Sequence, residues 1–83
     1  MVSSQIAMYG TAWCPDCTRS KRWLDRHGIP FTWHDIEKDE KARAYVVQVN
    51  HGNRSVPTLV FSDGSILVEP SDAELANKLG VAT

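Results

Sequence analysis

The hydrophobic and polar positions of the chain divide it into seven predicted elements. Residues 5–9 are mostly apolar, which is typical of a strand in the middle of a sheet. Residues 15–27 repeat apolar positions at helical spacing, and Gly28 is expected to end this helix. The other predicted elements are, in order, a strand at 31–36, a helix from Asp39 as N-cap to about Asn50, strands at 58–61 and 65–68, and a helix that begins at residues 70–72 and stops at Gly80.

The order of these elements predicts an α/β fold with one mixed sheet. A strand, a helix and a strand in succession form a right-handed crossover, so the first two strands should be parallel. Asp63-Gly64 is a hairpin turn signal, so the last two strands pair antiparallel and lie on the other side of the first strand. The prediction is a four-stranded sheet in the order 2-1-3-4, with three helices that cover both faces.

Length and charge narrow the class of protein. The chain has 83 residues, which corresponds to one domain spanning residues 1–83. Its nine basic and ten acidic residues are interspersed and give a net charge of -1, so no basic patch for nucleic acid is expected. The first residues do not resemble a signal peptide, and no apolar run approaches membrane-spanning length. We therefore expect a cytoplasmic monomer with no nucleic-acid or membrane partner.

Both cysteines lie in Cys14-Pro15-Asp16-Cys17, at the start of the first predicted helix. Pro15 suits the first helical position, so Cys14 becomes the N-cap and Cys17 lies one turn into the helix. The N–H groups of Asp16 and Cys17 can then donate to the Cys14 sulfur, next to the positive end of the helix dipole. We expect Cys14 to be held as a thiolate, the nucleophile in disulfide exchange, and Cys17 to be the more buried, protonated sulfur.

The cysteine spacing favours redox chemistry over a structural role. A disulfide between residues 14 and 17 closes a very small loop, so it would remove little entropy from the unfolded chain. Structural zinc needs four ligands, and the chain has no further cysteine and no paired spacing among its three histidines. The favoured interpretation is a redox-active disulfide, and the alternative is that the two cysteines form half of a metal site.

The chain resembles the glutaredoxins, which have the thioredoxin fold, over nearly its whole length. Three features carry the resemblance: the Cys14–Cys17 motif at a strand-to-helix junction, Arg54-Ser55-Val56-Pro57, which is similar to the family's T-V-P segment, and Phe61-Ser62-Asp63-Gly64. The resemblance implies a thioredoxin-like, glutaredoxin-type fold in the order β-α-β-α-β-β-α. It also implies a cis bond before Pro57, with an ordinary trans proline as the alternative. Residues 53–58 and the ending from Asp63 are most similar to the mycoredoxins of actinobacteria, which use mycothiol in place of glutathione.

Two departures from ordinary glutaredoxins bear on the chemistry. The family's Gly-Gly turn after the last strand, which helps to hold the glycine carboxylate of glutathione, is replaced by Glu69-Pro70-Ser71. Mycothiol has no such carboxylate, so this change favours mycothiol. The family's tyrosine between the cysteines is replaced by Asp16, whose charge opposes a nearby thiolate. We expect Pro15 and Asp16 to tune the pKa of Cys14. We also expect Asp16 to make the Cys14–Cys17 couple more reducing, and the alternative is that Asp16 is a solvated acid with no redox effect.

The resemblance implies a thiol–disulfide oxidoreductase that reduces mixed disulfides between proteins and a small thiol. Cys14 would be the nucleophile and Cys17 the resolving thiol, with mycothiol favoured over glutathione as the reducing co-substrate and no bound cofactor or metal. One alternative is a thioredoxin-like dithiol donor to an enzyme such as ribonucleotide reductase. Another is an iron–sulfur or metal-binding scaffold, which Pro15 disfavours because it stiffens the site.

The candidates for binding the small thiol and the protein substrate are spread over three segments: Thr11, Trp13, Arg54, Val56, Pro57, Ser71 and Asp72. By resemblance, Val56 and Pro57 would face the cysteines. Ser71 and Asp72 begin a helix, whose N–H groups suit an anion or sugar hydroxyls, and plain N-capping is the alternative. For Arg54 the alternative is a solvated loop charge.

Other aromatic residues have more ordinary interpretations. Trp13 is expected to lie exposed beside Cys14 as an apolar platform for protein substrates, with packing against the Val-Pro loop as the alternative. Trp23 and Trp33 are expected to be partly buried structural residues. Strand alternation points His34 inward, as a satisfied core histidine.

Overall fold

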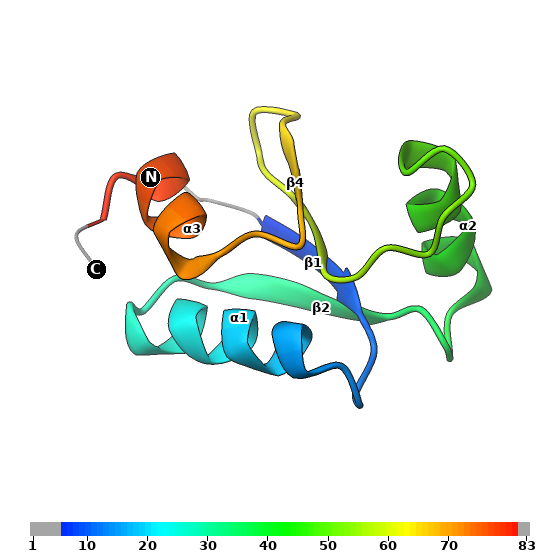
Figure 1. Ribbon diagram of the computed structural model, residues 1–83, viewed down its shortest axis with the longest axis horizontal. Coiled ribbons are helices and arrows are strands. Elements are labelled where there is room, and N and C mark those ends of the chain that lie inside the picture. Colours follow the sequence, from blue (N-terminus) through cyan, green and yellow to red (C-terminus); the bar gives the residue numbers. More distant parts are fainter. Residues whose placement is uncertain (1–5, 82–83) are drawn as a thin grey trace.

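The computed structural model describes residues 6–81 and confirms the predicted element order (Figure 1). Its strands are β1 (Ile6–Gly10), β2 (Phe31–Asp35), β3 (Thr58–Val60) and β4 (Ile66–Val68), and its helices are α1 (Pro15–Arg26), α2 (Glu40–Val49) and α3 (Asp72–Leu79). The predicted first strand includes Gln5, which lies outside the described residues. Observed and predicted bounds differ by a residue or two, as is usual at element ends. None of the described helices is long and apolar enough to cross a membrane.

The four strands form one mixed sheet in the predicted order, β2-β1-β3-β4. β1 pairs parallel with β2, with Ile6 opposite Phe31, and antiparallel with β3, with Met8 opposite Leu59. β3 and β4 form the antiparallel hairpin at one edge of the sheet. Because β1 is paired on both sides and covered on both faces, its almost entirely apolar sequence matches its place.

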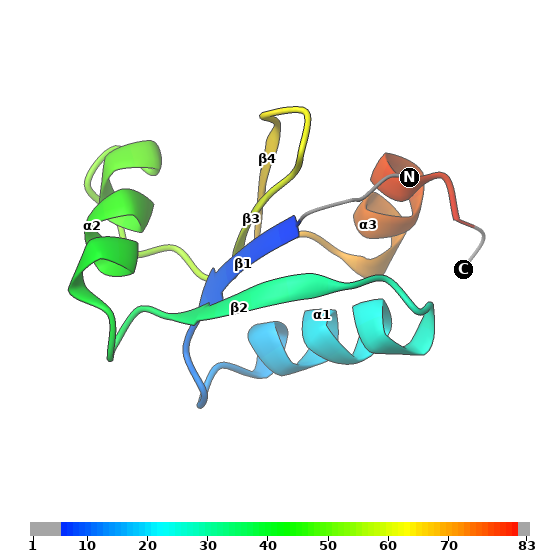
Figure 2. The same ribbon diagram turned by 180° about the vertical axis from the view of Figure 1, so that it is seen from behind.

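Helices cover both faces of the sheet, as predicted. Met8 of β1 points into the larger core cluster, which includes Leu24 of α1 and Leu75 of α3. The next residue, Tyr9, points to the other face and packs against the smaller cluster, which includes Val46 of α2. Figures 1 and 2 show α1 and α3 together on one side, with α2 apart from them. The alternation of β1 thus assigns α1, and with it the cysteines, to the face that carries the larger core.

The aromatic residues outside the site agree with their predicted roles, with differences in burial. Trp23 is more buried than expected, with 1% of its surface exposed and its ring against His27. Trp33 is partly buried against the larger cluster, as expected. His34 is only half-buried, and its ring stacks 4.6 Å from that of Tyr9. The expected core histidine lies at a partly covered position because β2 is an edge strand.

A buried hydroxyl ties the segment before β3 to the end of α2. Thr58 is fully buried, and its Oγ1 donates to the Ser55 carbonyl at 2.7 Å. The same oxygen accepts a hydrogen bond from Asn50 Nδ2 at 3.1 Å, and this amide also donates to the Val46 carbonyl at 2.8 Å. These bonds hold both ends of the turn that contains residues 56 and 57.

We expect Thr58→Val to lower the free energy of unfolding by about 1–3 kcal/mol, because it leaves buried polar groups without their partner. Urea denaturation measures this loss. Asn50→Ala should then cost less in the Thr58→Val background than in the wild type, since the two side chains share one hydrogen bond. Strictly additive costs would show that the network does not act as a unit.

Candidate active site

The loop between β1 and α1 places Cys14 at the N-cap of α1, as predicted. Cys14 has extended backbone angles (φ -82°, ψ 118°), and Pro15 begins the helix. The Cys14 Sγ accepts a hydrogen bond from the Cys17 backbone N–H at 3.3 Å. The expected bond from the Asp16 N–H is absent among the described residues. The start of α1 thus directs one N–H donor at this sulfur, an arrangement that favours negative charge there.

Cys14 and Cys17 are both free thiols and differ in accessibility. The exposed fraction is 7% for Cys14 and 1% for Cys17, so Cys17 is the more buried of the two, as predicted. Cys14 is more recessed than its place at a helix tip suggests. Its N–H donates to the Thr11 carbonyl at 3.4 Å, which folds the preceding loop against the helix. Within residues 6–81, no group of three or more potential ligand side chains is arranged to hold a metal ion.

Burial raises the pKa of the Cys17 thiol to about 12. The Thr11 backbone N–H acts in the opposite direction, while the neighbouring Cys14 and Asp16 add to the increase in this pKa. A protonated thiol is a poor nucleophile, so this environment disfavours Cys17 as the attacking sulfur at neutral pH.

Asp16 has a partner that the sequence analysis missed. Arg19 Nη1 donates to Asp16 Oδ1 at 2.9 Å, one turn along α1. The same guanidinium donates to the Pro70 carbonyl at 3.0 Å, and its Nε lies 3.5 Å from an Asp72 carboxylate oxygen. Arg19 therefore offsets part of the Asp16 charge. The influence of Asp16 on the redox couple stays a prediction.

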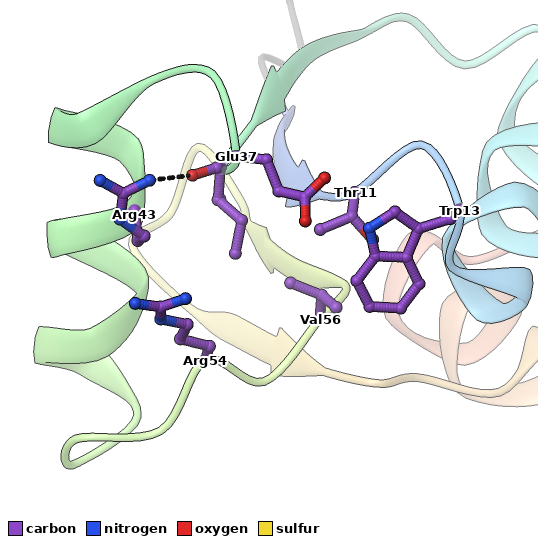
Figure 3. A pocket seen from close by; sticks show the side chains of 7 residues that line it. Thr11, Trp13, Glu37, Arg43, Arg54 and Val56 are labelled. Atoms are coloured by element: carbon purple, nitrogen blue, oxygen red, sulfur yellow. Dashed lines mark hydrogen bonds between the residues drawn. The ribbon is translucent and has the colours of Figure 1, made fainter.

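A cavity of about 260 Å³ lies beside the loop that leads to Cys14 (Figure 3). It is lined by four predicted binding residues, Thr11, Trp13, Arg54 and Val56, and by Ile36, Glu37 and Arg43, which the sequence analysis did not single out. The missed residues follow β2 or belong to α2. Only the parallel pairing of β1 with β2 brings them to the cysteine loop, so no local sequence pattern marks them.

The wall of the cavity nearest Cys14 combines an apolar ring with an unsatisfied hydroxyl. Trp13 is 68% exposed, as predicted, and its indole edges the cavity. Thr11 is buried, and its Oγ1 has no hydrogen-bond partner among the described residues. A buried hydroxyl without a partner costs free energy, and a ligand in the cavity can supply that partner.

The opposite wall carries charge of both signs. Figure 3 shows the Glu37 carboxylate extending toward Thr11 and Trp13, with the two arginines on the far side of the cavity. Arg43 Nη1 donates to the Ile36 carbonyl at 3.0 Å, which ties this guanidinium of α2 to the residue that follows β2. Arg54 comes from an exposed loop position.

The Val56–Pro57 peptide bond is cis, as the resemblance implied. Pro57 is fully buried, and its carbonyl accepts the Glu69 N–H at 2.8 Å, which ties it to the end of β4. Val56 is partly buried and packs against both core clusters while it lines the cavity. The structure thus places Val56 in the cavity wall and buries Pro57, which does not line the cavity.

Comparison with known proteins agrees with this geometry. The sequence model of the family described as Glutaredoxin matches residues 6–66, which is more than half of the chain. The chain belongs to the glutaredoxin family. It is therefore a thiol–disulfide oxidoreductase with a thioredoxin-like fold.

Two relatives and one solved structure show how far the likeness of this glutaredoxin extends. A protein of Mycobacterium tuberculosis that is named as a glutaredoxin is 42% identical over 79 residues, 95% of this chain and 94% of the relative. Mycoredoxin 1 of Corynebacterium glutamicum is 40% identical over 76 residues, 92% of this chain and 94% of the relative. A mutant of the thioredoxin-like protein BC3987 has a TM-score of 0.81 and 26% identity, over 93% of this chain and 96% of that structure.

Three binding candidates of this glutaredoxin, Pro57, Ser71 and Asp72, are not among the residues that line the cavity. Ser71 is the N-cap of α3. Its Oγ accepts the Glu74 N–H at 3.1 Å, and its own N–H donates to the Glu74 carboxylate at 2.8 Å, which makes a capping box. Asp72 lies beside Arg19. Capping accounts for the contacts of Ser71, and a role for any of the three residues in thiol binding stays a prediction.

We expect Cys17 in a Cys14→Ser variant of this glutaredoxin to resist alkylation at neutral pH, because burial, the largest cause of its raised pKa, does not depend on Cys14 and only the thiolate reacts. The rate should increase about tenfold per pH unit above neutrality and should not level off near the free-thiol value of about 8.5. In urea, the same thiol should level off there. Mass spectrometry of iodoacetamide adducts measures both rates, with circular dichroism as the check of folding. A folded-state plateau by pH 9 contradicts the assignment.

Proposed function

We propose that this glutaredoxin reduces mixed disulfides between proteins and a small thiol, with Cys14 as the nucleophile. Family membership gives the reaction class. The observation that best supports the choice of sulfur is the bond from the Cys17 N–H to the Cys14 Sγ at the start of α1. The cavity beside Thr11 and Trp13 supports a small ligand next to this sulfur.

The proposed reaction is two successive thiol–disulfide exchanges. The Cys14 thiolate attacks the small-thiol sulfur of the mixed disulfide, and the client protein leaves as a thiolate that takes up a proton. Cys14 is then bonded to the small thiol. A second small thiol can attack that small-thiol sulfur, which frees Cys14 and releases the small-thiol disulfide. Alternatively, Cys17 loses its proton and attacks Cys14, which releases the small thiol and leaves a Cys14–Cys17 disulfide.

Mycothiol is the small thiol that we propose. The relative of 40% identity is named Mycoredoxin 1, and the chain lacks the Gly-Gly turn that would hold a glycine carboxylate. The charge of the cavity adds an argument of its own. Glu37 faces Trp13 across the space, so a ligand carboxylate placed there would meet a like charge, whereas hydroxyl groups could donate to Glu37 and accept from Arg54.

The test of the preference is turnover of one mixed-disulfide substrate with mycothiol or glutathione as reductant. We expect kcat/KM to be at least about tenfold higher with mycothiol, a difference of about 1.4 kcal/mol. Arg54→Ala should increase KM for mycothiol with a smaller change in kcat, because it removes a donor from the cavity. Arg22→Ala, on the exposed side of α1, is the matched control. Equal kcat/KM values for the two thiols would rule out the preference.

A thioredoxin-like dithiol donor is the rival function, supported by the two free thiols in one helical turn. Cys17→Ser separates the two functions. If the small thiol resolves the intermediate, the variant should retain at least about a third of the mixed-disulfide turnover and should lose reduction of an intramolecular disulfide such as that of insulin. Loss of both activities would favour the dithiol donor. Cys14→Ser should abolish both, as the control for the nucleophile.

A further inference from the structure

Gly10 ends β1 at the point where the chain turns toward the cysteines. It is buried, and its φ is not in the left-handed region, so its backbone does not require glycine. A Cβ built at this position would lie 2.5 Å from the Cys17 Sγ and 2.9 and 3.1 Å from Cη2 and Cζ3 of Trp33. Real Cβ atoms essentially never come within 3.0 Å of such neighbours, so the space is already occupied.

The other four glycines of the chain have the opposite character. Gly28, Gly52, Gly64 and Gly80 have positive φ and open space where a Cβ would lie. They serve the conformation of turns and helix ends. Gly10 instead allows the Cys17 sulfur and the Trp33 ring to lie close to the backbone of β1, and Cys17 belongs to the active-site motif.

We propose that Gly10 is a positioning residue for Cys17. The space left by its missing side chain is where the Cys17 sulfur rests when both cysteines are reduced, and this resting place stabilises the dithiol relative to the Cys14–Cys17 disulfide. The inference rests on the proposed function, because it assumes that Cys14 and Cys17 form a redox pair.

The steric argument gives the direction of the effect. In the disulfide the two sulfurs are bonded at about 2.05 Å, so we expect oxidation to draw the Cys17 sulfur toward Cys14 and away from the space beside Gly10. The two thiols lose two electrons and two protons to the oxidant, and the new bond joins their sulfurs. A Cβ at position 10 would therefore clash more with the reduced form, in which the Cys17 Sγ lies 2.5 Å away, than with the oxidised form.

Gly10→Ala should shift the thiol–disulfide equilibrium toward the disulfide by about threefold or more, which makes the reduction potential about 14 mV more negative. Redox titration against a dithiothreitol buffer, read by alkylation and mass spectrometry, measures this shift on the protein alone. Trp33→Phe is the matched background, because it removes the ring atoms that a Cβ would also meet. The shift should persist when Gly10→Ala is made in Trp33→Phe.

Each other outcome overturns the inference. An unchanged potential in folded Gly10→Ala would show that Cys17 does not rest there, and a shift that vanishes in the Trp33→Phe background would assign the effect to the ring. If Gly10→Ala alone does not fold, the comparison of Trp33→Phe with the double variant decides. A wild type that forms no Cys14–Cys17 disulfide would refute the pairing itself, whereas a wild-type disulfide with no shift on substitution would refute only the role of Gly10.

Discussion

The site depends on one short contact, the bond from the Cys17 N–H to the Cys14 sulfur. It exists because Pro15 begins a helix directly after Cys14, so the free Cys17 N–H in the first turn of that helix points back at the sulfur. The helix in turn is held by burial of its inner face, which includes Cys17 and Leu24, against β1. The same turn of backbone therefore exposes one sulfur to a positive helix end and moves the other into the core, where burial keeps it protonated.

Much of this arrangement follows from local sequence rules. Apolar periodicity and turn residues predict all seven elements, and the handedness of the crossover predicts the strand order. The N-cap geometry of Cys14 follows from the proline after it. What local rules miss are contacts between segments far apart in the chain. Glu37 and Arg43 reach the cavity only because β2 lies beside β1, and Arg19 reaches the start of α3 only through the packing of α1 against α3.

The residues proposed to bind the small thiol lie in two separate places in the structure, and their polar groups differ in the partners that they find. Thr11 and Val56 lie on neighbouring loops at one end of the sheet, where unpaired polar groups such as the Thr11 hydroxyl face a cavity. Ser71 uses its hydroxyl and its N–H in a reciprocal capping box. From the sequence Thr11 and Ser71 look alike, because a polar residue before a helix can cap it or can bind a ligand. The structure distinguishes them only by partner, since the Ser71 hydroxyl caps α3 and the Thr11 hydroxyl has no partner among the described residues.

Charge around the cysteines is distributed in a way that composition alone cannot reveal. The acid within the motif, Asp16, is paired with Arg19, whose guanidinium also reaches Asp72 and the Pro70 carbonyl. In the cavity, Arg43 is held by a backbone carbonyl, so Glu37 and Arg54 are the lining charges with no such bond among the described residues. A ligand in this cavity would therefore meet one acid and one base that are free to bind it. An acid and a base together can accept from and donate to the hydroxyl groups of a ligand, so under the proposed function this pair is the candidate for selection among small thiols.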